Sequence, residues 1–90
     1  MKRFVIEREI AGVGRMKTDQ RIATAAKSNE ALAQLGGKAQ WIHSYITDDK
    51  TFCVYMADSE DSVREHARLS GFPANKITEV HNMLDPMTTV

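Results

Sequence analysis

The sequence predicts an α+β fold, and three observations support that prediction. Its 90 residues are enough for one small domain with a single core. Two segments have helix-forming composition and end at glycine, a common helix terminator. The segments around them alternate between apolar and polar residues with a period of two, which is typical of strands. We therefore expect residues 1–90 to form a single domain of strands and helices.

The first strand is predicted at residues 3–9. Phe4 and Ile6 fall on one face of this strand, and Val5 and Glu7 fall on the other. If the face with the larger apolar side chains contacts the helices, the carboxylate of Glu7 points to the opposite side of the sheet.

The first helix is predicted at residues 19–35, after a glycine-containing turn at residues 11–15. Thr18 is expected to be the N-cap of this helix, because a hydroxyl oxygen accepts a hydrogen bond from a free backbone N–H of the first turn. Gly36 and Gly37 follow the last apolar residue, and we expect them to end the helix.

A hairpin is expected over residues 40–56, and the facing of its side chains depends on the turn. A three-residue loop at 48–50 would place four polar or aromatic side chains on one face: His43, Tyr45, Cys53 and Tyr55. A two-residue loop at 48–49 would separate them. We favour the longer loop because it gathers the apolar side chains on the face toward the helices: Ile42, Ile46, Phe52, Val54 and Met56.

A second helix and a fourth strand complete the prediction. Ser59 caps a helix at residues 60–69, which Gly71 and Pro73 end, and residues 76–84 form the last strand. The order strand, helix, strand, strand, helix, strand predicts a ferredoxin-like βαββαβ sandwich, with a four-stranded antiparallel sheet and two helices on one face. The other face is left uncovered, so we expect a homodimer in which two sheets form a dimeric α/β barrel.

Charge and composition exclude several classes of function. Twelve basic and twelve acidic residues cancel, which argues against a nucleic-acid partner. The single cysteine excludes an intramolecular disulfide and suits a reducing compartment. The N-terminus has no signal-peptide core, and no apolar run reaches the roughly 20 residues that span a bilayer. We therefore expect a cytoplasmic protein without a membrane partner.

Candidate metal ligands are found in the hairpin and in the outer strands. The imidazole of His43 and the thiol of Cys53 suit a divalent transition metal such as nickel, copper or zinc. Glu7 and Glu79 would add carboxylates from other strands, and Tyr55 has the same parity as Cys53. The sequence has no local metal motif, so these ligands would have to converge from separate strands.

Each candidate also has a purely structural interpretation. Cys53 can be a small buried hydrophobic residue, and Glu79 can be a solvent-facing acid on an edge strand. His43 can be an exposed or hydrogen-bonded strand histidine. Four further side chains are expected to line the cavity or to support the ligands: Trp41, Tyr45, His66 and His81.

Several strings of residues together resemble a small bacterial family of nickel-binding or nickel-responsive proteins, formerly described as a domain of unknown function. These strings are Ser28–Leu32, Trp41–Tyr45, Asp48–Tyr55, Arg64–Ala67, Gly71–Ala74, Thr78–Val80 and Asp85–Pro86. The resemblance extends from Phe4 to Pro86. It implies a ferredoxin-like fold, a homodimer with a central barrel, and Ni²⁺ held in that barrel.

Three functions are compatible with these features. We favour a nickel-binding or nickel-responsive protein without catalytic activity. The alternative is a dimeric α/β-barrel enzyme, similar to a monooxygenase or isomerase, that acts on a small apolar or aromatic substrate. Acid, base or nucleophile would then come from His43, Tyr45 and Cys53. The third possibility is an interaction module whose uncovered face is only a dimer interface.

Overall fold

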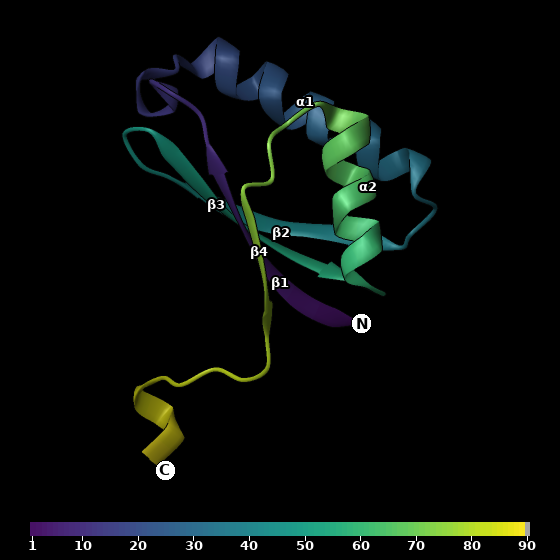
Figure 1. The fold of residues 1–90 in the computed structure, drawn as a ribbon. Coiled ribbons are helices and arrows are strands. Elements are labelled where there is room, and N and C mark those ends of the chain that lie inside the picture. The colour runs from purple at the N-terminus through teal and green to yellow at the C-terminus, as the bar shows by residue number, and fades with distance from the viewer. Residues whose placement is uncertain (90) are drawn as a thin grey trace.

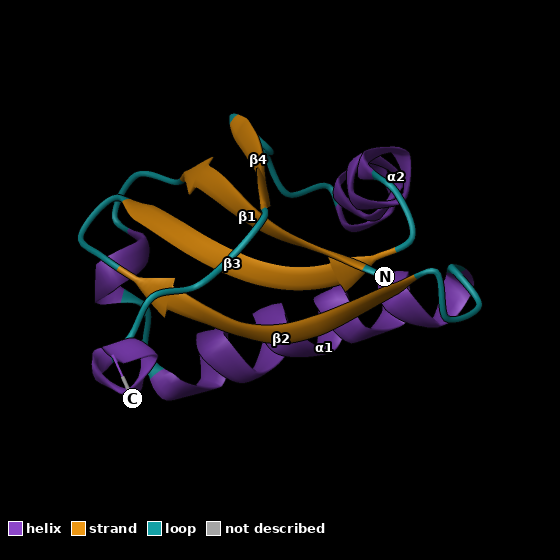
Figure 2. Cartoon of the chain, turned by 90° about the horizontal axis from the view of Figure 1, so that it is seen from below, coloured by secondary structure: helices purple, strands orange, loops and turns teal. Residues whose placement is uncertain are grey.

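Two helices cover one face of a four-stranded antiparallel sheet in the computed structural model, which describes residues 1–89 (Figure 1). The elements in chain order are β1 (Lys2–Glu9), a short 3-10 helix η1 (Val13–Arg15), α1 (Thr18–Gln34), β2 (Ala39–Ile46), β3 (Lys50–Ala57), α2 (Glu60–Ser70), β4 (Lys76–Val80) and a second 3-10 helix η2 (Pro86–Thr89). The strand order is β2-β3-β1-β4, as Figure 2 shows. This is the ferredoxin-like arrangement, and the predicted fold class is confirmed.

The fourth strand is shorter than predicted. It ends at Val80 rather than at residue 84, because its only partner in the sheet is β1. Val80 is paired with Arg3, near the beginning of β1, so β1 has almost no residues left to pair with residues 81–84. The chain instead extends away from the strands toward η2 (Figure 1).

The first helix begins at Thr18, and Lys17 rather than Thr18 is its N-cap. The backbone N–H of Lys17 donates to Oε1 of Gln20 at 2.9 Å, which is the glutamine half of a capping box. Gly36 and Gly37 have φ angles of 59° and 87°. Since glycine adopts this left-handed region without a Cβ penalty, the prediction that these residues end the helix is confirmed.

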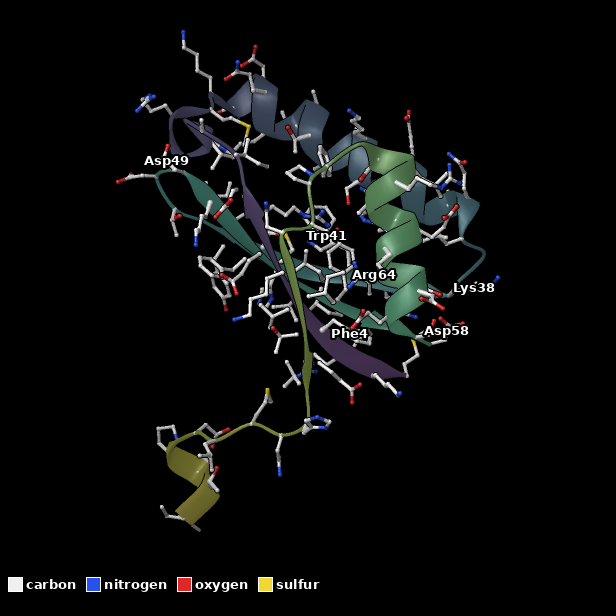
Figure 3. The ribbon with its side chains drawn as sticks, viewed as in Figure 1. Phe4, Lys38, Trp41, Asp49, Asp58 and Arg64 are labelled. Atoms are coloured by element: carbon white, nitrogen blue, oxygen red, sulfur yellow. The ribbon has the colours of Figure 1, made fainter. Side chains whose placement is uncertain are left out.

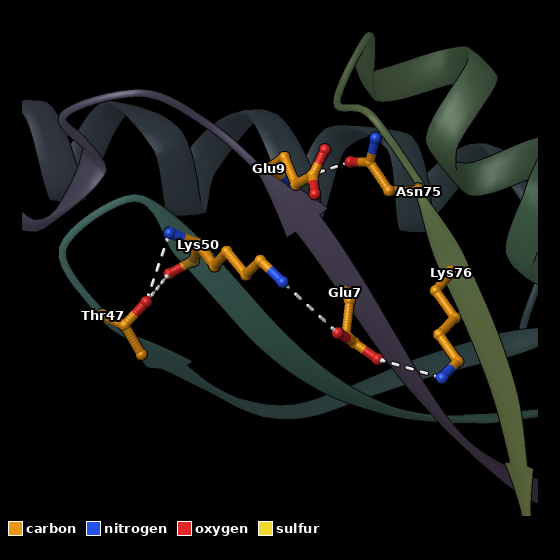
Figure 4. Close-up of polar contacts among 6 residues, drawn as sticks. All are labelled: Glu7, Glu9, Thr47, Lys50, Asn75 and Lys76. Carbon is orange, nitrogen blue, oxygen red and sulfur yellow. Dashed lines mark hydrogen bonds and ion pairs between the residues drawn. The ribbon is translucent and has the colours of Figure 1, made fainter.

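The hairpin has the shorter of the two loops. The N–H of Thr47 donates to the carbonyl oxygen of Lys50 at 2.9 Å, so only Asp48 and Asp49 lie in the loop. Figure 4 shows the side chain of Thr47 bonded to the same residue. The predicted three-residue loop is therefore wrong, and a β-bulge between Trp41 and His43 shifts the register of β2 once more.

The two faces of β3 are consequently the reverse of the prediction. Cys53 and Tyr55 pack beneath the helices, with 6% and 2% of their surface exposed, whereas His43 and Tyr45 lie on the uncovered face. A shift of one residue moves every side chain of a strand to the other face, which is why one loop residue decides the grouping. Three residues predicted to face the helices therefore face outward: Phe52, Val54 and Met56.

The core lies between the sheet and the helices. Phe4 and Ile6 of β1 are fully buried there, as their alternation predicted, and Leu35 and Val63 pack against the same cluster. Figure 3 shows Phe4 beneath α2. On the uncovered face, half-buried apolar side chains come from three strands: Val5, Phe52, Val54, Met56 and Val80. None of the described helices is long and apolar enough to cross a membrane.

Candidate functional site

The candidate metal ligands lie on both faces of the sheet. His43 and Glu7 are on the uncovered face. His43 is paired with Val54 of β3, and Glu7 is paired with Phe52 of the same strand. Cys53, Tyr55 and Glu79 are on the helix side. Glu79 lies on the edge strand β4, where it is paired with Phe4. Glu7 and Glu79, which were predicted to add carboxylates to one metal site, therefore lie on opposite faces of the sheet. Among residues 1–89, no three histidine, cysteine or acidic side chains form a group that could hold a metal ion.

Glu7 is a partly buried carboxylate between two ammonium groups. Its oxygens lie 3.9 Å from Nζ of Lys50 and 4.0 Å from Nζ of Lys76, as Figure 4 shows. Both distances are long for an ion pair, and both lysines are substantially exposed, so each pair stabilises the fold only weakly. The two lysines nevertheless neutralise the negative charge of Glu7, which would otherwise be available to a metal ion.

His43 is an exposed imidazole on the uncovered face. Its ring packs edge-on against Tyr45, with the two ring centroids 4.9 Å apart. In the described part of the chain, neither ring nitrogen of His43 makes a hydrogen bond. Its position opposite Val54 and its free nitrogens make it the strongest single metal-ligand candidate on this face.

The remaining predicted cavity residues are dispersed. Trp41 lies on the helix side, where its indole N–H donates to Oγ of Ser44 at 3.0 Å, and Figure 3 places it below α1. His81 is exposed after β4, with Nδ1 3.4 Å from a Glu79 carboxylate oxygen. His66 of α2 is fully buried between the helices and the sheet, and its Nε2 lies 3.3 Å from the carbonyl oxygen of Ser28.

A chain of buried polar groups connects β3, α1 and α2. The Oη of Tyr55 lies 3.2 Å from Oγ of Ser28, which in turn lies 3.2 Å from Nε2 of His66. Burial raises the pKa of Tyr55 above its ordinary value, and Ser28 opposes this only in part. Burial also lowers the pKa of His66, and the nearby positive charge of Arg8 lowers it further. Both side chains are therefore neutral near pH 7.

We expect the stability of the fold to decrease as the pH falls below about 6.5, the pKa of an unfolded histidine. Because the pKa of folded His66 is lower, the unfolded chain takes up a proton first in this range. The contribution of neutral His66 to the free energy of unfolding is fully present above about pH 6.5. Below that pH it decreases by no more than about 1.4 kcal/mol per pH unit.

Urea denaturation at several values between about pH 5 and 8 measures this dependence. His66→Gln is expected to flatten it, since glutamine keeps a polar group without titrating. A variant that shows the same pH dependence as the parent would contradict the assignment to His66.

A cavity of about 420 Å³ lies on the helix face, between α1 and the hairpin end of the sheet. The sequence predicted a cavity on the opposite face, because it placed Cys53 and Tyr55 there. The reasoning from sequence also missed Arg8, which lines the cavity and is only 3% exposed. Its parity with Phe4 and Ile6 on β1 was the signal that could have found it.

Comparisons with known proteins give one family and one fold. A family model described as nickel responsive protein SCO4226-like matches residues 4–80. Among solved structures, the chain is similar to the one described as "Crystal structure analysis of SCO4226 from Streptomyces coelicolor A3(2)", with a TM-score of 0.74 and 16% identity over 91% of this chain and 99% of that chain. At this identity the likeness shows the fold alone. No curated protein matches the chain.

Proposed function

Because the chain belongs to the SCO4226-like family of nickel-responsive proteins, we propose that it binds Ni²⁺ between two copies of itself, at the uncovered face of the sheet. The supporting observation is that this face carries a patch of apolar side chains beside one exposed histidine. Val5, Val54 and Met56 lie at its centre on β1 and β3, and His43 is paired with Val54. We also infer a cytoplasmic location, in which the Cys53 thiol stays reduced.

A second copy is the occupant that this face requires. A contiguous apolar sheet face in a small protein usually marks an interface, and two identical faces meet most simply about a two-fold axis. The segment after β4 leaves the body on the same side of the sheet, where Figures 1 and 2 show it extended. It adds exposed apolar side chains to that side: Met83, Leu84 and Met87.

The proposed ligands are His43 from each copy, with carboxylate help from Glu7. Residues 1–89 of one chain offer too few donors, and symmetry doubles each donor at a shared interface. Imidazole and carboxylate groups suit nickel, as they suit other divalent transition metals. For Glu7 to take part, its ion pairs with Lys50 and Lys76 must open, and their length makes that inexpensive. Cys53, Tyr55 and Glu79 are not included, since they lie on the other side of the sheet.

The enzyme alternative receives no support from the geometry. It required His43, Tyr45 and Cys53 on one wall of one cavity, where they could act as acid, base or nucleophile. Cys53 lies on the opposite face of the sheet from the other two, so this set is not available.

Calorimetric titration of the untagged protein with nickel chloride tests the proposal. We expect saturable binding at about pH 8 that is strongly reduced at about pH 5, because imidazole ligands bind metals in their neutral form. His43→Ala is expected to weaken binding at least about tenfold, since even groups that only orient metal ligands contribute about 10–100-fold.

His81→Ala is the matched control, because His81 is an exposed histidine beyond the end of β4. It should bind nickel as the parent does. Unchanged nickel binding by His43→Ala would show that the site is wrongly assigned, and no binding by the parent would contradict the proposed function.

A further inference from the structure

We propose that the cavity on the helix face binds a small organic carboxylate, with Arg8 as the partner of its charged group and the apolar walls around its body. This cavity lies on the other side of the sheet from the proposed nickel site, so the two inferences are independent. They depend on different residues and on different ligands.

The cavity has the size and chemistry of a small-molecule site. Its volume of about 420 Å³ falls within the range of about 300–1,000 Å³ that is typical of such sites. Apolar side chains from β2, α1, η1 and the loops next to η1 form much of its wall: Ile10, Val13, Met16, Ala25, Trp41 and Ile46. Such walls suit an apolar ligand body rather than an inorganic ion.

Arg8 provides a buried positive charge in this wall. One of its terminal nitrogens, Nη1, donates to the carbonyl oxygen of Pro73 at 2.7 Å. Its other terminal nitrogen, Nη2, is buried without a hydrogen-bond acceptor in the described part of the chain. Across residues 1–89, Arg8 also forms no ion pair with a carboxylate. The ring of Phe72, with its centroid 5.7 Å from Cζ of Arg8, attracts the cation but cannot neutralise it.

A buried charge without a counter-ion is costly, and a ligand that supplies the opposite charge lowers that cost. The planar guanidinium group matches a carboxylate in shape and can donate two parallel hydrogen bonds to it. The hydroxyl group of Thr51 also lines the cavity and can donate to the same ligand, whereas those of Ser28 and Tyr55 are hydrogen-bonded to each other.

Only one buried cation is present among the described residues of the cavity wall, which favours a monocarboxylate. Arg21 also lines the cavity, but it is exposed and already donates to the Met16 carbonyl oxygen and to Oγ1 of Thr18. A ligand with several negative charges would leave most of them unpaired in an apolar space.

The protein contains its own reporter for this site. Trp41 is the only tryptophan and lines the cavity, so its fluorescence should change when a ligand enters. We expect octanoate to bind saturably and at least about tenfold more tightly than octan-1-ol, which has the same chain length without the charge. No binding of octanoate, or equal affinity for the acid and the alcohol, would overturn the proposal.

Arg8→Met removes the charge and keeps an unbranched side chain in the cavity wall. This variant is expected to lose at least about tenfold in octanoate affinity while its weak affinity for octan-1-ol remains. Arg64→Met is the control, because Arg64 is an exposed arginine of α2 that pairs with Glu60 outside the cavity. Full octanoate affinity in Arg8→Met would overturn the proposal.

Two further comparisons keep the test decisive. If Arg8→Met does not fold, the difference between octanoate and octan-1-ol in the parent protein decides the outcome alone. His43→Ala is expected to bind octanoate as the parent does, so loss of nickel binding and loss of carboxylate binding remain distinguishable. Equal loss of octanoate affinity in His43→Ala and Arg8→Met would contradict a site on the helix face.

Discussion

Val54→Asp is expected to convert the proposed homodimer into monomers. Val54 lies at the centre of the uncovered face, paired with Val5 of β1 and with His43 of β2. When two copies meet through this face, the substitution brings two unpaired carboxylates into an apolar interface. Burying such charges costs several kcal/mol for each ion, which corresponds to at least about a thousandfold weaker association.

Sedimentation velocity at micromolar concentration measures this effect. Ala23→Asp is the control, because it adds the same charge at an exposed position of α1 and should leave the dimer intact. A dimeric Val54→Asp would exclude the uncovered face as the interface. Nickel binding is expected to disappear together with the dimer, and a monomeric variant that still binds nickel would contradict a site shared between two copies.

Gly14→Ala is expected to lower the free energy of unfolding by about 2–3 kcal/mol, the upper part of the range for overpacking. A Cβ at this position would lie 2.6 Å from the carbonyl oxygen of Thr47 and 2.9 Å from Cα of Asp48. Both are backbone atoms of the β2–β3 turn, so neither can rotate away. The Gly14 N–H also donates to the Asp48 carbonyl oxygen at 3.0 Å, and relief of the clash would lengthen that bond.

Urea denaturation of Gly14→Ala and Gly36→Ala separates the contact from the general effect of losing a glycine. Gly36 has a φ of 59° and no atom within 4 Å of its position for a Cβ. Gly36→Ala should therefore lower the free energy of unfolding by only about 1–2 kcal/mol, the strain of a side chain in the left-handed backbone conformation. If Gly14→Ala were no more destabilised than Gly36→Ala, the close contact between η1 and the hairpin turn would have no energetic importance.

The candidate site could be predicted only in part from the sequence. His43 and Glu7 were found because their residue types bind metals and because alternation placed Glu7 away from Phe4 and Ile6. Their separation from Cys53 and Tyr55 could not be found, because it depends on one loop residue, and the bulge changes only the facing of residues before His43. Neither feature has a strong local signal, since Asp-Asp suits turns of either length.

The sequence by itself determined the order of the elements, the glycine ends of the helices and the inward facing of Phe4 and Ile6, because periodicity and glycine conformation act over a few residues. Tertiary structure decided which face of β3 meets the helices, where β4 ends and that Arg8 is buried in a cavity wall. These outcomes depend on pairing and packing between residues far apart in the chain. Because a strand repeats every two residues, a single slip in that pairing moves its side chains to the opposite side of the sheet.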